Sequence, residues 1–214
     1  MVGTGRFLIL AGGSLDTRGP EAGLLSGPWE AVVCADSGAD HAQRLGLTPA
    51  RLVGDFDSIS EGSLAAYEGV PREAHPADKD KTDTQLAVEW ALDRGAYWIV
   101  IAGGGTSRFD HSLANAFLLQ LIHDRGAKGV VTDGRQSVYL LREELELSRP
   151  EGTLLSVLPL GPGCRGLTLS GLRWELDGFD LEPGDTRTIS NEFTPAVARL
   201  RLEEGSALVI VGPA

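Results

Sequence analysis

Short apolar runs alternate with amphipathic stretches along about the first two thirds of the chain. The runs are too short for helices and suit strands buried on both faces; they are Phe7–Ala11, Ala31–Ala35, Arg51–Val53, Tyr97–Ile101 and Gly129–Thr132. Strands that alternate with helices form a parallel sheet covered by helices on both faces. The pattern therefore predicts a doubly wound, mostly parallel α/β domain over residues 1–135.

Local signals mark where the helices begin and end. Ser58 with Glu61 and Thr82 with Gln85 fit the capping box, in which a hydroxyl and a side chain three residues later satisfy each other's backbone amides. A glycine after the last periodic residue favours the left-handed conformation that ends a helix. Two expected helices are therefore Thr84–Arg94 before Gly95 and Asp110–Arg125 before Gly126.

The helical period disappears over residues 136–214. Glu144–Ser148, Leu172–Leu176 and Ala196–Leu202 alternate apolar with polar residues, as strands buried on one face do. Turn signals such as Gly161-Pro162-Gly163 and Pro183-Gly184 separate such segments. The pattern predicts a second, all-β domain, a small β-sandwich.

Glycine, aspartate and serine follow four of the predicted parallel strands. The segments are Gly12-Gly13-Ser14, Asp36-Ser37-Gly38-Ala39-Asp40, Gly54-Asp55-Phe56-Asp57-Ser58 and Gly103-Gly104-Gly105. Each taken alone is typical of a turn. Ligands of open parallel sheets bind beyond the carboxyl ends of the strands, so we expect the four segments to converge on one crevice.

Two acidic segments of this crevice suit a bound cation and a phosphate. Asp55 and Asp57 would repel each other unless a cation lay between them. Mg²⁺ is a suitable cation, because its usual ligands are a few carboxylate oxygens together with phosphate oxygens. The alternative is that Asp57 caps the following helix. Residues 78–83, Asp-Lys-Asp-Lys-Thr-Asp, lead into a helix N-terminus, which binds anions through its free amides. The alternative there is a solvated charged loop with a capping box.

Arg108 and Asp110 open a further helix after the triple glycine. The Arg108 guanidinium offers a planar fork to phosphate oxygens, and Asp110 is suited to orienting it, binding metal or acting as a base. The alternative is a structural Arg–Asp pair, and His111 receives no role. The dinucleotide fingerprint, the Walker A loop and the protein-kinase motifs are missing from the sequence. The residues alone thus indicate Mg²⁺-assisted chemistry on a phosphorylated ligand, by transfer or by hydrolysis.

Charge and cysteine content narrow the class of protein. The chain has 19 Lys and Arg against 30 Asp and Glu, a net charge of −11, and no extended basic cluster, which argues against nucleic-acid binding. The two cysteines, Cys34 and Cys164, form no zinc or disulfide pattern and are expected to be buried thiols. The first apolar run is too short for a signal peptide or a membrane span. We expect a cytoplasmic protein without a membrane partner.

Four ordered segments resemble the motifs of the thiamine pyrophosphokinase (thiamine diphosphokinase) family. They are Ala35-Asp36-Ser37-Gly38-Ala39-Asp40, Gly54-Asp55-Phe56-Asp57-Ser58, Asp80-Lys81-Thr82-Asp83 and Arg108-Phe109-Asp110-His111. Gly171–Trp174 and Ile189–Phe193 are similar to segments of that family's β-sandwich. Ser37 departs from the family's frequent glycine, and Asp40 stands where asparagine is frequent, so Asp40 receives no role.

The resemblance implies transfer of pyrophosphate from ATP to the hydroxyl of thiamine, which gives thiamine diphosphate and AMP. It implies that Asp55, Asp57 and Asp83 hold Mg²⁺, with Arg108 and Asp110 beside the transferring phosphates. The residues implied to bind ATP are Gly12, Gly13, Asp36, Lys79, Lys81, Thr82, Gly103, Gly104 and Gly105.

The resemblance also implies a homodimer in which each thiamine site is shared between subunits. Trp174 would stack or pack near thiamine, and Ser190 and Asn191 would contact its pyrimidine. Without the family, a lone tryptophan is more often core and a Ser-Asn pair more often a turn. Two other functions stay open from the residues: an Mg²⁺-dependent phosphohydrolase that uses Asp55, Asp57 and Asp110 on a phosphoester, and a non-catalytic nucleotide-binding regulator.

Overall fold

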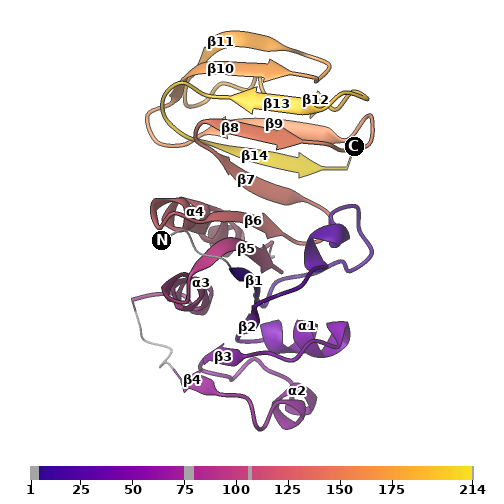
Figure 1. Ribbon diagram of the computed structural model, residues 1–214, viewed down its shortest axis with the longest axis vertical. Coiled ribbons are helices and arrows are strands. Elements are labelled where there is room, and N and C mark those ends of the chain that lie inside the picture. Colours follow the sequence, from indigo (N-terminus) through magenta and orange to yellow (C-terminus); the bar gives the residue numbers. More distant parts are fainter. Residues whose placement is uncertain (1–4, 75–79, 106–107, 214) are drawn as a thin grey trace. The chain divides into compact units, whose positions relative to one another are not determined.

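The computed structural model describes residues 5–74, 80–105 and 108–213. The chain divides into two compact units, Met1–Arg135 and Gln136–Ala214 (Figure 1). The first unit is an α/β domain and the second is built from β-strands, so the predicted fold class is confirmed.

The first unit contains a parallel sheet with strand order β6-β5-β1-β2-β3-β4. The strands are β1 (Gly5–Leu10), β2 (Ala31–Ala35), β3 (Arg51–Gly54), β4 (Arg72–Ala74), β5 (Ala96–Ala102) and β6 (Lys128–Thr132). The five predicted apolar runs all form strands. The short strand β4, with the sequence Arg-Glu-Ala, is an edge strand without an apolar run, so the pattern gave no sign of it.

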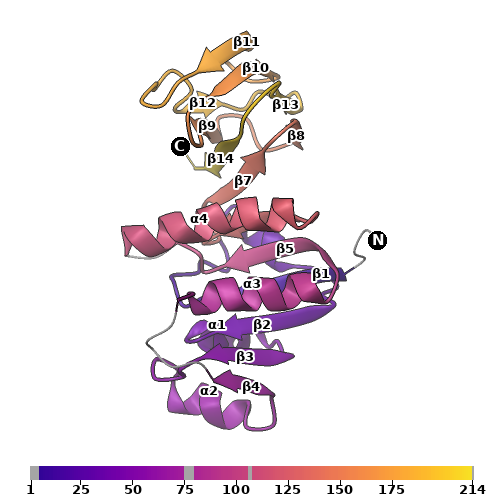
Figure 2. The same cartoon turned by 90° about the vertical axis from the view of Figure 1, so that its left-hand side faces the viewer.

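Helices cover both faces of this sheet. They are α1 (Gly38–Leu45), α2 (Glu61–Ala66), α3 (Asp83–Asp93) and α4 (Phe109–Asp124), with a short 3-10 helix at Ala22–Leu25. Figures 1 and 2 show α3 and α4 on one face and α1 and α2 on the other. The central strands β1 and β5 are therefore buried on both faces, which explains their nearly continuous apolar sequences.

The helix boundaries follow most of the local signals. The Thr82 hydroxyl accepts a hydrogen bond from the Gln85 amide at 3.2 Å, and Gly95 and Gly126 take positive φ angles of 79° beyond α3 and α4. The predicted cap at Ser58 is wrong, because the residue that caps α2 is Ser60, whose hydroxyl accepts from the Ser63 amide. A turn through residues 55–59 delays that helix by two residues.

The second unit consists of antiparallel strands in two groups, ordered β12-β9-β14-β7 and β11-β10-β13-β8. Their bounds are β7 (Ser137–Leu141), β8 (Glu144–Leu147), β9 (Leu154–Pro159), β10 (Cys164–Ser170), β11 (Leu176–Leu181), β12 (Asn191–Glu192), β13 (Ala198–Arg201) and β14 (Ala207–Gly212). The predicted strand at Leu172–Leu176 is wrong. Leu172 makes a single bridge to Phe193, and the next strand begins only at Leu176.

Two smaller expectations concern burial and membranes. Cys34 and Cys164 are free and buried, as predicted, and burial raises the pKa of both thiols. In the described part of the chain, every helix is too short or too polar to cross a bilayer.

Candidate functional site

The four polar segments lie at one edge of the parallel sheet, as expected. Strand β1 lies between β5 and β2, so the chain order reverses at β1 and creates a crevice at the carboxyl ends of these strands. The Gly13 amide donates to the Gly103 carbonyl at 3.0 Å. A Cβ atom on Gly12 would lie 2.3 Å from the Ser37 hydroxyl oxygen, and one on Gly54 would lie 1.8 Å from Asp36 Oδ1. Neighbouring loops are thus in contact.

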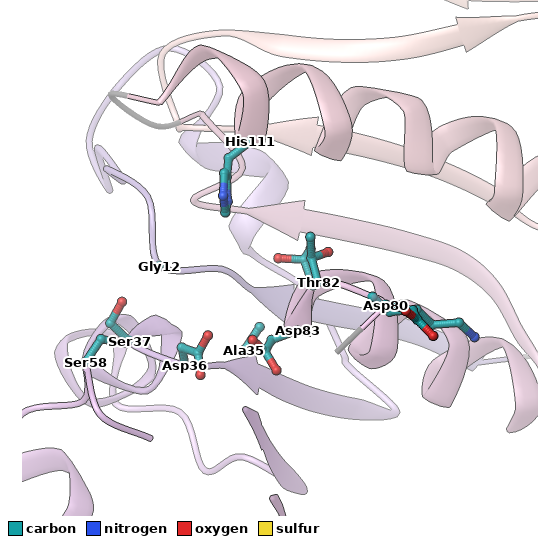
Figure 3. A pocket seen from close by; sticks show the side chains of 11 residues that line it. Gly12, Ala35, Asp36, Ser37, Ser58, Asp80, Thr82, Asp83 and His111 are labelled. Carbon is teal, nitrogen blue, oxygen red and sulfur yellow. The ribbon is translucent and has the colours of Figure 1, made fainter. Parts of the chain in front are cut away.

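A pocket of about 420 Å³ opens at this edge (Figure 3). Its lining consists of Gly12, Ala35, Asp36, Ser37, Ser58, Asp80, Lys81, Thr82, Asp83, Thr84 and His111. The pocket brings together five residues predicted from the sequence: Gly12, Asp36, Lys81, Thr82 and Asp83. His111, which received no role, points from the first turn of α4 toward the strand-end loops in Figure 3. Among the residues that the structure describes, the predicted residues of the α/β unit that lie outside the lining are Gly13, Asp55, Asp57, Gly103, Gly104, Gly105, Arg108 and Asp110.

Asp55 and Asp57 flank a strained residue beside the pocket. Phe56 has a φ angle of 67°, a left-handed conformation that is unusual for an aromatic residue. The Asp57 amide donates to Asp55 Oδ1 at 3.2 Å. A hydrogen bond with the Asp55 carboxyl and the charge of that group raise the pKa of Asp57. Asp57 does not cap α2, so that alternative is wrong.

The three predicted magnesium ligands do not form a ready-made cluster. Within residues 5–74, 80–105 and 108–213, no three histidine, cysteine, aspartate or glutamate side chains lie close enough to hold a metal ion together. Asp83 lies in the first turn of α3 and lines the pocket, whereas Asp55 and Asp57 lie on the turn after β3. A pair of carboxylates with phosphate oxygens still suits Mg²⁺, which is usually bound by one or two carboxylates, phosphates and water.

The segment before α3 combines a cation, a helix cap and a helix N-terminus. Lys81 Nζ donates to both carboxylate oxygens of Glu89, at 2.8 and 3.0 Å, and its side chain is 45% exposed. Thr82 is the N-cap, and Thr82, Asp83 and Thr84 line the pocket, so the N-terminus of α3 lies at the pocket. Lys79, the other predicted lysine, lies outside the described residues.

Arg108 and Asp110 form an exposed pair at the start of α4. Arg108 Nη2 donates to Asp110 Oδ2 at 2.7 Å and Nε donates to Oδ1 at 3.3 Å, which is the planar forked geometry. The hydrogen bond and the Asp110 charge raise the pKa of Arg108, and the same contact lowers the pKa of Asp110. Each side chain is 66% exposed, so the guanidinium stays accessible to an anion.

The glycines after β5 are used mainly for packing between loops. Gly103 and Gly104 are buried, and both amides donate to the Thr132 carbonyl, at 2.9 and 3.3 Å. The buried Asn115 side chain donates to the Gly104 carbonyl at 3.0 Å. These amides are therefore not directed at a ligand, and Asn115, which sequence reasoning missed, positions the loop.

His41 positions the loop after β1 and was also missed. Its Nε2 lies 2.6 Å from the Gly13 carbonyl oxygen, and Arg44 contacts its Nδ1. Because a guanidinium can only donate, Nδ1 accepts and Nε2 carries the proton that binds Gly13. Burial, the largest effect, lowers the pKa of His41, so the ring is neutral. No local signal could reveal this contact, which joins residues 28 positions apart.

In the second unit, a short segment presents an exposed tryptophan. Trp174 is 51% exposed, and the Arg173 guanidinium carbon lies 4.6 Å from its ring centroid. Asn191 is buried; its side chain accepts from the Trp174 amide at 3.0 Å and donates to the Trp174 carbonyl at 2.6 Å. Ser190 has a φ angle of 57°, and its amide donates to Ser156 Oγ at 2.9 Å. The Asn191 side chain therefore orients Trp174 through its backbone.

Comparisons with known proteins agree with this arrangement. The model of the thiamin pyrophosphokinase catalytic domain matches residues 26–131, and that of the thiamin pyrophosphokinase vitamin B1 binding domain matches residues 141–206. The thiamine pyrophosphokinase of Bacillus subtilis (strain 168) is 30% identical over 169 residues, which cover 77% of this chain and 79% of the relative. Thiamin pyrophosphokinase 1 of Caenorhabditis elegans is 28% identical over 171 residues, 75% of this chain and 68% of the relative. A crystal structure of the Bacillus subtilis protein superposes with a TM-score of 0.87 at 25% identity, over 98% of this chain and 99% of that one.

Proposed function

The chain belongs to the thiamine pyrophosphokinase family, and we propose that the pocket at the β5-β1-β2-β3 edge holds ATP for its reaction. The protein is a thiamine diphosphokinase, an enzyme that transfers pyrophosphate from ATP to thiamine. The observation that carries the proposal is the pocket itself, in which Asp36, Lys81 and Asp83 meet at the switch point of the sheet. Nucleotides bind at such switch points in doubly wound folds.

We propose that Asp55 and Asp57 hold Mg²⁺ together with ATP phosphates, and that Asp83 faces the same ion across the pocket. The support is the position of these two exposed carboxylates on one short turn, where the Asp57 amide donates to Asp55 Oδ1 at 3.2 Å. Their hard oxygen atoms fit this ion. When bound, Mg²⁺ would neutralise charge on the phosphate oxygens during in-line displacement.

The remaining crevice residues would bind and orient the phosphates. Arg108 would bind phosphate oxygens with its exposed guanidinium while Asp110 keeps the guanidinium plane in place. The amides of the first turn of α3, next to Thr82, suit a phosphate, and Lys79 or Lys81 would offset developing charge. Gly12 and Gly13 allow ATP to approach the backbone, and the neighbouring Gly103–Gly105 loop supports them. Catalysis of this kind depends on positioning and electrostatic stabilisation.

Thiamine is proposed to bind with Trp174 and Ser190 of the β-unit, which contains the match to a vitamin B1 binding domain. The exposed indole offers an aromatic face to the cationic thiazolium ring, and Asn191 keeps that indole in place. We propose a homodimer in which the crevice of one subunit and the Trp174 region of the other share each thiamine. The buried free thiols of Cys34 and Cys164 support a cytoplasmic location.

Product analysis tests this function. The purified protein is incubated with ATP, Mg²⁺ and thiamine, and the nucleotides are separated by chromatography. We expect thiamine diphosphate and AMP in equal amounts, and no AMP when thiamine is omitted. Stoichiometric ADP would contradict transfer of pyrophosphate. Release of orthophosphate from an ester would instead favour the phosphohydrolase, and no turnover would favour the regulator.

A further inference from the structure

The turn that carries Asp55 and Asp57 has a conformation that its own sequence does not favour. Phe56, between the two carboxylates, has a φ angle of 67°. Left-handed backbone at a bulky residue costs free energy and persists only where the surrounding structure holds it. Contacts at the two ends of the turn are therefore required to keep the carboxylates side by side.

Both ends of this turn are attached to the segment that begins α1. At the first end, Gly54 packs so closely on Asp36 that a Cβ atom there would lie 1.8 Å from Oδ1. At the second end, the Ser60 hydroxyl donates to Asp40 Oδ1 at 2.6 Å, and the Ser60 amide donates to the same oxygen at 3.3 Å. Asp40 lies 20 residues before Ser60 and outside the pocket lining.

A second contact between the same helices provides a natural comparison. Ser63 Oγ donates to Gln43 Oε1 at 2.8 Å, so α1 and α2 are joined both by Asp40 with Ser60 and by Gln43 with Ser63. Only the first of these contacts reaches the end of the turn. Burial raises the pKa of Asp40, but hydrogen bonds, chiefly the one from the Ser60 hydroxyl, outweigh this effect and lower the pKa, so the carboxylate is ionised and a good acceptor at neutral pH.

We propose that Asp40 is a positioning residue: by accepting both Ser60 hydrogen bonds it holds the turn in the shape that keeps Asp55 and Asp57 ready for Mg²⁺. The proposal rests on the proposed function in assigning Mg²⁺ to those two carboxylates. Asp40 acts through Ser60 and touches neither ATP nor the metal. The role needs an acceptor oxygen at this position and not a negative charge, so asparagine should fill it.

The test compares Asp40→Ala, Asp40→Asn and Gln43→Ala in the full-length protein. The first readout is hydrogen exchange of amides 55–60 without metal or nucleotide. Asp40→Ala should speed exchange about tenfold, the scale for a lost hydrogen bond, while the other two variants should stay within about twofold of the parent. The second readout is the Mg²⁺ concentration that gives half-maximal activity, which should rise about tenfold in Asp40→Ala alone, with kcat at saturating Mg²⁺ largely kept.

Several results would overturn the proposal. Unchanged exchange in Asp40→Ala would mean that Asp40 does not hold the turn. Asparagine behaving like alanine would mean that charge matters, and Gln43→Ala behaving like Asp40→Ala would mean general helix packing. Faster exchange without a change in Mg²⁺ dependence would refute the link to the metal. If Asp40→Ala does not fold, Ser60→Gly is measured in its place in both experiments. This variant removes the Ser60 hydroxyl that donates to Asp40, and glycine at an N-cap costs the helix little.

The proposed function fails separately. If the parent protein makes no AMP from ATP and thiamine, the reaction assignment is wrong, and the exchange experiment still decides whether Asp40 holds the turn.

Discussion

Replacing Gly54 by alanine should destabilise the α/β unit strongly, because two separate penalties act at this residue. Gly54 has a φ angle of 142°, which side-chain-bearing residues rarely adopt, and such strain costs about 1–3 kcal/mol. The new Cβ would also lie 1.8 Å from Asp36 Oδ1 and 2.7 Å from its Cγ. Either the carboxylate rotates away or strands β2 and β3 move apart, and overpacking of this kind costs about 1–3 kcal/mol.

The sum of about 2–6 kcal/mol is a large share of a typical free energy of unfolding, about 5–15 kcal/mol. It corresponds to a fall in Tm of roughly 5–20 °C at about 2–4 °C per kcal/mol. Urea unfolding would measure the loss, and hydrogen exchange of the β2 and β3 amides would show whether it lies in this unit. Asp36 should also shift, so ATP binding should weaken even where the variant stays folded.

Gly46→Ala is the matched control. Gly46 also has a positive φ angle, 65°, but its added Cβ would meet no atom within 4 Å. That variant should therefore lose only the backbone penalty, about 1–2 kcal/mol. If the two variants lost equal stability, to within about 0.5 kcal/mol, the close approach between Gly54 and Asp36 would have no energetic weight and the reasoning would be refuted.

Three further predictions concern charge, pH and assembly. Asp57→Asn should lower turnover at least about a hundredfold while leaving Tm nearly unchanged, since the side chain is exposed; near-normal activity across a Mg²⁺ titration would reject the metal assignment. Burial lowers the pKa of His41 below 6.5 in the folded chain, so the unfolded chain binds more protons near that pH. The free energy of unfolding, measured with urea, should consequently fall as pH drops from neutral through 6.5. His41→Gln keeps an N–H donor but does not titrate, so its free energy of unfolding should depend less on pH. The same pH dependence in the variant and the parent would contradict this role of His41. Mixing Asp57→Asn with a Trp174→Ala/Ser190→Ala double variant should restore roughly a quarter of the sites by subunit exchange, whereas proven exchange without recovery would rule out a site shared between subunits.

The amino-acid sequence by itself determined the features that depend on neighbouring residues. Apolar runs predicted the central strands, and Thr82, Gly95 and Gly126 marked helix ends, because strand burial and helix capping leave period and cap signals in the local sequence. The order of the polar segments after those strands was enough to identify the family and to place one crevice. The same local reasoning failed at Ser58, where the strained Phe56 turn moves the cap to Ser60.

Only the tertiary structure decided which polar side chains hold the site together. Asp40 with Ser60, His41 with Gly13, and Asn191 with Trp174 are pairs separated by 17 to 28 residues. The sequence gives each of these residues the ordinary signals of a turn or a helix surface. Their partners depend on the strand order, because the strand order determines which loops are neighbours. A short polar side chain can form a hydrogen bond only with a group that this arrangement places within about 3 Å. Chemistry at the strand ends could thus be predicted from local patterns, whereas the contacts that position it arise from long-range packing.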